Sequence, residues 1–246
     1  LIAISGDSDV EVSGGQLVGD RDTHRYATSG THEWGHGISV SGSRITIRDV
    51  HISKCTGDGV CIGGRSSDVV IANIVSTNNR RQGLSITNCS NIRVYDSEFS
   101  YSKGTSPECG IDIEPDEGGS CTNVVIQNCR MNNNAKYGVN IWKRSTNVTI
   151  QSCTIERNGS LGMGTNGISG LKVLKNTIRY NSATGIVYNT GTRSITHSGN
   201  LSYGNYTRLG TKTRTQFTMS GWSSKIERDI LRRSNYTLTI GSNTYK

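Results

Sequence analysis

The stretch Cys109-Gly110-Ile111-Asp112-Ile113-Glu114-Pro115-Asp116 combines a glycine, two alternating isoleucines and three acids. Successive side chains of a β-strand point to opposite faces, so the isoleucines share one face and Asp112 and Glu114 share the other. The spacing predicts a short strand with a buried apolar side and a solvent-exposed acidic side. Carboxylates placed two residues apart repel each other, and a pair of this kind is tolerated most easily where it has acid–base work to do. A plain solvated strand face is the alternative.

The glycine of this stretch belongs to a repeat. Glycines followed by an apolar-x-apolar triplet or a close variant recur at spacings of 22, 24, 27, 28, 24 and 23 residues, at Gly37, Gly59, Gly83, Gly110, Gly138, Gly162 and Gly185. A second apolar pair follows in the same turns, at Ile45/Ile47, Val69/Ile71, Ile92/Val94, Val124/Ile126, Val148/Ile150 and Leu171/Val173. This period predicts an all-β solenoid, a parallel β-helix of about seven to eight coils stacked about 4.8 Å apart. The leucine pattern of leucine-rich repeats is missing, and a propeller blade needs nearly twice this length.

Stacking also predicts columns of like residues. A polar column follows the second strand pair at Asp49, Asn73, Asp96, Asn128 and Ser152, and we interpret it as turn residues that satisfy backbone groups. The repeat covers residues 1–200, which we take as the β-helix domain. Residues 201–246 are Thr-rich and basic, and we expect a cap or oligomerisation segment there because a solenoid end exposes unpaired strand edges.

Composition narrows the class of protein. The chain has 30 Gly and 2 Pro, and its seven Cys show no C-x-x-C spacing, so we expect mostly buried free thiols, as in a reducing compartment, and no zinc site. No apolar run approaches the ~20 residues of a membrane span, so we expect a soluble chain without membrane insertion. It begins at Leu1 within an apolar run and shows no signal-peptide pattern. We expect a fragment or a processed piece.

The net charge of +8 is uneven along the chain. Residues 201–246 hold eight basic and two acidic residues, which is +6, and the other 19 basic and 17 acidic residues leave the body at +2. A nucleic-acid binder carries its basic residues along the body, so we do not expect a nucleic-acid partner.

Aligning the coils on their glycines makes sequence columns into spatial neighbours. His36 and Asp58 precede successive glycines and become vertical neighbours, while Arg81 shares a column of alternating charge with Glu108 and Lys136. Glu114 and Trp142 come four residues after their glycines. An aromatic ring beside carboxylates suits a sugar, whose C–H face stacks on the ring. Each column also has a plain structural interpretation: a covered shaft, surface ion pairs or a turn contact.

At this point the chain can be compared with a known family. The segments GDRDTH (19–24), THEWGHGI (31–38), GDGVCIGG (57–64), NNRRQGLSI (78–86) and GIDIEPD (110–116) resemble the pectate-lyase-like superfamily of right-handed parallel β-helices. The resemblance is closest to phage tailspike or tail-appendage members and to bacterial polysaccharide-degrading members. The chain departs from two branches. The polygalacturonase branch has an aspartate pair followed by G-H-G and then R-I-K, whereas here Gly35-His36-Gly37 precedes the acids and no R-I-K follows them. The D-P-H motif of alginate epimerases is also absent.

The resemblance implies a carbohydrate-active protein working on a groove along the coils. Our first hypothesis is a glycoside hydrolase in which Asp112 and Glu114, with Asp58 as a third candidate, supply the acid and the base. The alternative is a polysaccharide lyase or uronan epimerase, in which His36 or a carboxylate removes a proton and Arg81 neutralises the sugar carboxylate. A third hypothesis is a non-catalytic receptor-binding shaft of a phage tail.

Substrate binding is expected from a wider set of residues: Trp142, Arg80, Asp116, His32, Glu33, Asp20, Asp22, Asn140 and Lys143. The long polar excursion at residues 20–36 contributes several of them, because excursions from a rigid solenoid are usually binding loops. No cofactor or metal is required, although a hard cation such as Ca²⁺ suits Asp22, Asp112 or Asp116. The resemblance to tailspikes implies a homotrimer, an extracellular or virion-tail location and a polysaccharide partner.

Overall fold

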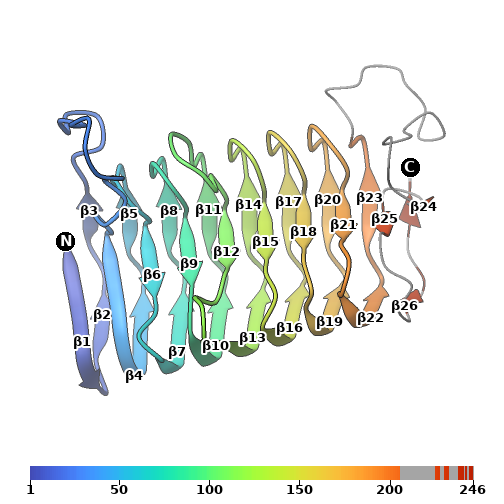
Figure 1. The fold of residues 1–246 in the computed structure, drawn as a ribbon, viewed down its shortest axis with the longest axis horizontal. Helices are drawn as coiled ribbons and strands as arrows, with labels where there is room; N and C mark the ends of the chain where they lie inside the picture. Colours follow the sequence, from blue (N-terminus) through green and yellow to red (C-terminus); the bar gives the residue numbers. More distant parts are fainter. Residues whose placement is uncertain (206–224, 228–229, 233–237, 241, 243, 246) are drawn as a thin grey trace.

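The computed structural model describes residues 1–205, 225–227, 230–232, 238–240, 242 and 244–245. Within these residues all regular structure is β, and the strands wind into a parallel solenoid of about seven turns (Figure 1). The predicted fold class is therefore confirmed. No helix that could cross a membrane occurs in this described part of the chain.

Each coil contributes strands to three columns. The first column, at the site described below, contains β1 (Ile2–Ser8), the first half of β4 (Ile38–Arg48), β6 (Val60–Ile62), β9 (Leu84–Ile86), β12 (Ile111–Ile113), β15 (Val139–Ile141), β18 (Met163–Thr165), β21 (Ile186–Tyr188) and β25 (Ile230–Arg232).

The second column continues from the same long strand. It contains β2 (Glu11–Ser13), the second half of β4, β7 (Ser67–Ala72), β10 (Cys89–Tyr95), β13 (Cys121–Gln127), β16 (Ser145–Gln151), β19 (Ser169–Leu174), β22 (Arg193–Ser198) and β26 (Leu238–Ile240).

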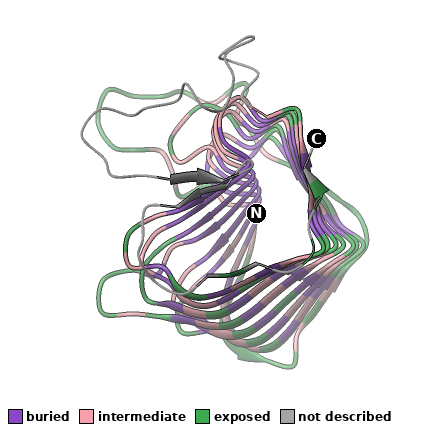
Figure 2. Ribbon diagram, turned by 90° about the vertical axis from the view of Figure 1, so that its right-hand side faces the viewer, coloured by how far each residue is buried: buried purple, intermediate pink, exposed green. Residues whose placement is uncertain are grey.

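The third column is a separate sheet. It contains β3 (Gln16–Val18), β5 (His51–Ser53), β8 (Val75–Thr77), β11 (Glu98–Ser100), β14 (Arg130–Asn132), β17 (Thr154–Glu156), β20 (Thr177–Arg179), β23 (Leu201–Tyr203) and β27 (Thr244–Tyr245). The coils superpose when viewed along the solenoid (Figure 2). Their buried apolar side chains form one core cluster.

The register matches the glycine repeat. Ile38, Val60, Leu84, Ile111, Val139, Met163 and Ile186 are paired in that order through successive strands of the first column. A Cβ atom added at Gly83 would lie 2.7 Å from the Gly110 carbonyl oxygen and 2.8 Å from the Phe99 Cβ. The glycine column is therefore required by close stacking of the coils. The second apolar pairs also stack as predicted, and Val148 and Ile150 are fully buried.

Members of the polar turn column bond one another through their side chains. Asp49, Asn73, Asp96, Asn128 and Ser152 all have φ between 50° and 57°, a left-handed conformation that Asn and Asp adopt more readily than most residues. The Asn73 side-chain amide donates to Asp49 Oδ1 at 2.7 Å, which links one coil to the next. The seven cysteines are free; six are buried and Cys61 is partly exposed.

The segment after residue 200 is described only in part. Its strands β25, β26 and β27 pair in parallel with β21, β22 and β23, so they extend all three columns by one further layer. The strand β24 (Lys225–Glu227) pairs antiparallel with β25. Residues 206–224, 228–229, 233–237, 241, 243 and 246, on which much of the predicted assembly role falls, lie outside the described residues.

Candidate functional site

A groove crosses the outer side of the first strand column. One hollow of about 400 Å³ is lined by Glu33, Trp34, His36, Cys61, Arg81, Ser85, Thr87, Glu114, Pro115, Asp116, Glu117 and Arg144. A second hollow of about 380 Å³ shares Arg81 and Glu114 with the first and adds Asn140 and Trp142 among its lining residues. The groove therefore runs from the excursion at residues 20–36 to Trp142, and Arg81 and Glu114 lie where the two hollows meet.

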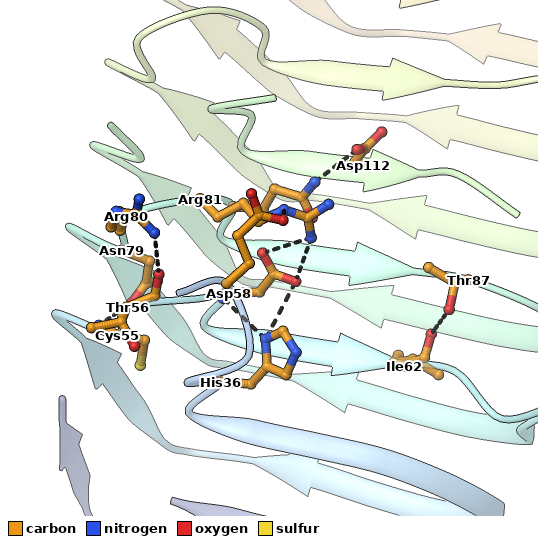
Figure 3. A network of polar contacts seen from close by, with 12 residues as sticks. His36, Cys55, Thr56, Asp58, Ile62, Asn79, Arg80, Arg81, Thr87 and Asp112 are labelled. Carbon is orange, nitrogen blue, oxygen red and sulfur yellow. Dashed lines mark hydrogen bonds and ion pairs between the residues drawn. The ribbon is translucent and has the colours of Figure 1, made fainter. Parts of the chain in front are cut away.

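Three predicted residues meet at the floor of the groove (Figure 3). His36 Nδ1 lies 3.4 Å from Asp58 Oδ2, as the column alignment predicted. Arg81 Nη1 lies 3.2 Å from the same oxygen, and Arg81 Nε lies 3.6 Å from Glu33 Oε2. Arg81 therefore pairs with Asp58 and Glu33. The expected column of alternating charge is present only between Lys136 and Glu108, whose charged atoms are 3.4 Å apart.

The hydrogen bonds determine the tautomer of His36. The backbone N–H of Asp58 donates to His36 Nδ1 at 3.1 Å, so Nδ1 acts as an acceptor and carries no proton. A neutral imidazole then carries its proton on Nε2. Desolvation, with help from the Arg81 charge, lowers the pKa of His36 to about 4, which keeps the ring neutral near pH 7. In this geometry His36 is an N–H donor. The Nδ1 lone pair accepts the Asp58 N–H, so the role of His36 as a base, which would require that hydrogen bond to break, stays a prediction.

Asp58 is a buried acid with an unusual ionisation. Its side chain is completely inaccessible to solvent, and burial raises the pKa of the carboxyl to about 7 in spite of the opposing effect of Arg81. The same carboxyl is thus partly protonated near neutrality. Asp58 does not line either hollow of the groove and is linked to the first hollow through its contacts with Arg81 and His36.

The predicted exposure of Asp112 is wrong. Its side chain points away from the apolar core, as the alternation required, but it is 0% exposed. The Gln82 amide donates to Asp112 Oδ2 at 2.7 Å, and the Asn140 amide donates to Asp112 Oδ1 at 2.9 Å. Desolvation, together with the charge of Glu114, raises the pKa of Asp112 well above its usual range. The outer side of a coil is covered here by side chains of the coils on either side.

Five other candidates lie along the groove. Glu33, Glu114 and Asp116 line the first hollow, and Asn140 and Trp142 line the second. Trp142 is 36% exposed, and its backbone N–H donates to the Ile113 carbonyl, which places the ring one coil after Glu114. The predicted grouping of Trp142 with Glu114 on one face is confirmed.

The remaining candidates lie away from the lining. The Arg80 guanidinium donates to the carbonyls of Thr31 and His32 and lies 4.6 Å from the centre of the Tyr26 ring. It therefore holds the excursion at residues 20–36 in place. His32 contacts His24. The Asp20 carboxylate is hydrogen-bonded to the His24 ring, and Asp22 forms an ion pair with Lys54. Lys143 is exposed and lines neither hollow. The structure thus gives these five no direct place in the groove.

Trp34 and Cys61 are among the lining residues that sequence reasoning missed. Trp34 is 84% exposed at the edge of the groove, and it stood inside the quoted segment THEWGHGI. Cys61 occupies the same column as Asp112, two residues after its glycine. The three carboxylates named for a hard cation are not gathered. Within the described residues, the group with metal-ligand spacing is His36, Asp58 and Cys61, whose ligand atoms all lie within 4.8 Å of one another.

Two curated relatives match part of the chain. Uncharacterized protein YclG of Bacillus subtilis (strain 168) is 38% identical over 122 residues, and the SPbeta prophage-derived uncharacterized protein YorA of the same strain is 32% identical over 124 residues. Each match covers 43% of this chain and 21% of the relative. The matched region thus spans about a fifth of either relative's length.

Solved structures share the fold at low sequence identity. The alginate lyase from Paenibacillus sp. str. FPU-7 has a TM-score of 0.71 at 13% identity, and 99% of this chain matches 82% of that chain. The A-module of the Azotobacter vinelandii mannuronan C-5 epimerase AlgE4 has a TM-score of 0.63 at 17% identity, with 100% and 74% coverage. Pectate lyase Pel9A has a TM-score of 0.61 at 14% identity, with 100% and 68% coverage. These likenesses establish a pectate-lyase-like fold.

The family model described as right handed beta helix region matches residues 13–154 and 109–228. These overlapping matches span most of the chain, and within the described residues they cover the stacked strands. The chain therefore belongs to the right-handed parallel β-helix family.

Proposed function

We propose that the protein processes an acidic polysaccharide by removing the proton next to a uronate carboxylate, as a lyase or an epimerase. The observation that carries the proposal is Arg81, which lies at the junction of the two hollows beside a carboxyl of Asp58 that is only partly ionised near neutrality. Its Nε–H has no hydrogen-bond partner. An unsatisfied buried donor is costly, and a substrate carboxylate that displaced Glu33 would satisfy it.

The other groups of the groove fit this chemistry. Glu114 lines both hollows beside Arg81 and is the carboxylate best placed to accept the proton. The Nε2–H of neutral His36 is a donor for a sugar oxygen. Trp34 and Trp142 stand toward the two ends of the groove and offer stacking faces for sugar rings. Similar solved structures carry the names alginate lyase, mannuronan C-5 epimerase and pectate lyase, and this supports a uronan as substrate.

Hydrolysis of a neutral glycan is the second candidate, and one observation favours it. Four carboxylates line the first hollow, Glu33, Glu114, Asp116 and Glu117, against the two guanidinium groups of Arg81 and Arg144. An excess of carboxylates repels an anionic polymer and suits acid–base cleavage of a neutral one. Asp112 and Glu114, which the sequence predicted as acid and base, cannot both contact a substrate in this structure, because the Asp112 side chain is fully buried.

One set of assays separates these candidates. The protein is incubated with alginate, pectate and neutral bacterial polysaccharides, and reducing ends, ultraviolet absorbance of unsaturated uronate and sugar configuration by NMR are followed. A lyase gives both of the first two signals, an epimerase changes only the NMR spectrum, and a hydrolase gives reducing ends alone. Binding without any of these signals would support a receptor-binding shaft, a role compatible with the prophage origin of the relative YorA, and would refute the proposal.

A matched pair of variants tests the assigned base. Glu114→Gln keeps the side-chain shape and removes the proton acceptor, so turnover should fall by ~10²-fold or more. Glu117→Gln removes the same charge from a residue that lines only the first hollow and should retain most of the activity. Equal losses in the two variants would show that the groove needs its negative charge in general, and would remove Glu114 from the proposed role.

A further inference from the structure

We propose that His36, Asp58 and Cys61 form a binding site for a borderline-soft divalent metal ion, of which Zn²⁺ is the best match. They offer one imidazole nitrogen, one carboxylate oxygen and one sulfur, and these atoms lie within 4.8 Å of one another. The site goes beyond the proposed function and does not depend on it. Zinc was not expected from the sequence because its cysteines lack paired spacing; stacking brings the three ligands together from two coils instead.

The spacing of two ligands already suits a tetrahedral ion. His36 Nδ1 and Asp58 Oδ2 are 3.4 Å apart, and two donors about 2.0–2.1 Å from a tetrahedral zinc ion lie about 3.3–3.4 Å from each other. Binding through Nδ1 replaces the hydrogen bond from the Asp58 amide with a metal bond. Cys61 follows Asp58 by three residues, and it lines the groove together with His36. Two of the three ligands therefore face the groove, which gives the ion an entry path from solvent.

The ligand chemistry selects the type of ion. Ca²⁺ and Mg²⁺ take oxygen ligands, whereas thiolate and imidazole favour zinc and similar transition metals. With Cys61 as thiolate and Asp58 as carboxylate, two negative charges balance a divalent ion, and the complex is neutral in a largely buried place. The pKa of Cys61 is raised to about 12, mainly by burial, so the free thiol is protonated near neutrality. Metal binding displaces that proton to solvent, as it does at coordinating thiols generally.

Arg81 competes with the metal ion for Asp58. Its Nη1 lies 3.2 Å from Asp58 Oδ2, so the metal and the guanidinium contend for the same oxygen. Metal binding moves Arg81 away from Asp58, and under the proposed function this would inhibit turnover by displacing the group that binds the sugar carboxylate. Removing the Arg81 charge should tighten metal binding by about tenfold or more, because a like charge a few ångströms from a divalent cation is strongly unfavourable.

Cobalt provides a direct test. The full chain, kept reduced, is titrated with Co²⁺, and the near-ultraviolet thiolate-to-cobalt charge-transfer band is followed, with Zn²⁺ added afterwards as competitor. We expect one ion per chain, a band that Zn²⁺ abolishes, and loss of the band in Cys61→Ser. Serine is a well-matched replacement, because Ser39 and Ser85 are the strand partners of Cys61 on the coils before and after it.

Two control variants make the result specific. Arg144→Gln removes a cation from the same hollow without touching Asp58, so Arg81→Gln should tighten Co²⁺ binding and Arg144→Gln should leave it within about threefold. His32→Gln tests a different place where imidazole could hold the ion, because His24 Nε2 and His32 Nδ1 are 3.0 Å apart; the band should be unchanged in this variant. The proposal is overturned if no charge-transfer band forms, if the band survives in Cys61→Ser, or if Arg81→Gln and Arg144→Gln bind the ion alike.

Discussion

Replacing Asp58 with asparagine should change how the stability of the β-helix depends on pH. The carboxyl has an unperturbed pKa of 3.8 and a pKa raised to about 7 in the folded chain, chiefly by burial. Between these values the folded protein binds a proton that the unfolded chain has lost. The contribution of Asp58 to the free energy of unfolding is therefore largest below about pH 4 and is lost as pH rises toward 7. At 1.36 kcal/mol per pKa unit, the loss is about 4 kcal/mol.

Asp58→Asn mimics the protonated carboxyl at every pH. The free energy of unfolding of the variant minus that of the parent should therefore increase by about 4 kcal/mol from pH 4 to pH 7 and then level off. Two histidines act in the opposite direction in both proteins: burial lowers the pKa of His36 and of His197 to about 4, so their stabilisation is lost as pH falls from 6.5 toward 4. Taking the difference between variant and parent removes this shared part.

The measurement is urea unfolding followed by tryptophan fluorescence at closely spaced pH values from 4 to 8, with reversibility verified at each. Asp68→Asn is the matched control, because Asp68 is exposed on the second strand column and accepts a hydrogen bond from Asn91. The increase with pH should be larger for Asp58→Asn than for this control. Equal difference curves for the two variants would mean that Asp58 is not desolvated in the fold, and the electrostatic description of the groove floor would fail.

Three further predictions concern the groove, the core and assembly. Trp142→Ala should raise KM severalfold with little change in kcat in steady-state kinetics on whichever polysaccharide proves to be the substrate, because a stacking platform binds ground state and transition state alike; a loss confined to kcat would contradict this. Val148→Asp should cost several kcal/mol by placing an unpaired charge in the core, whereas Thr149→Asp, on the outer side of the same strand, should melt near the parent temperature. We also propose that residues 201–246 mediate trimer formation; in sedimentation analysis a chain ending at residue 200 should then lose the trimer, and an unchanged mass would refute the proposal.

The fold could be predicted because its signal repeats. The glycines from Gly37 to Gly162 face the same steric demand, since a Cβ at Gly110 would meet the Gly138 carbonyl oxygen at 2.7 Å just as one at Gly83 would meet that of Gly110. A repeated demand produces a repeated residue, and the period gives the coil length directly. The His36 and Asp58 contact followed from the same register. Neither conclusion needed knowledge of the side chains around a particular position.

The exposure of individual site residues could not be predicted in the same way. Alternation along a strand tells which side chains leave the core but not whether neighbouring coils cover them. Asp112 leaves the core and is nevertheless fully buried, because amides from the coils on either side, Gln82 and Asn140, bond to both of its oxygens. Arg80 and Arg81 are adjacent in sequence, yet one holds the excursion at Thr31 and the other reaches the groove. Turn geometry decides between them, and no periodic pattern encodes it.

The ionisation of the two buried carboxyls, Asp58 and Asp112, is linked through Arg81. The charge of Asp58 helps to raise the pKa of Asp112, burial is the main cause of the raised pKa of both carboxyls, and Arg81 opposes the rise at both. One guanidinium thus serves two carboxyls that cannot both ionise cheaply, and the charge at the groove floor depends on how many protons this group of three holds. The carbonyl oxygen of the Gln82 amide lacks a hydrogen-bond partner, although its amide nitrogen bonds Asp112. Rotation of that amide by half a turn would present the free oxygen to a protonated Asp112, whose O–H can donate to it. The floor can therefore take up a proton at Asp112 by reorienting one side chain, while Arg81 stays in contact with Asp58.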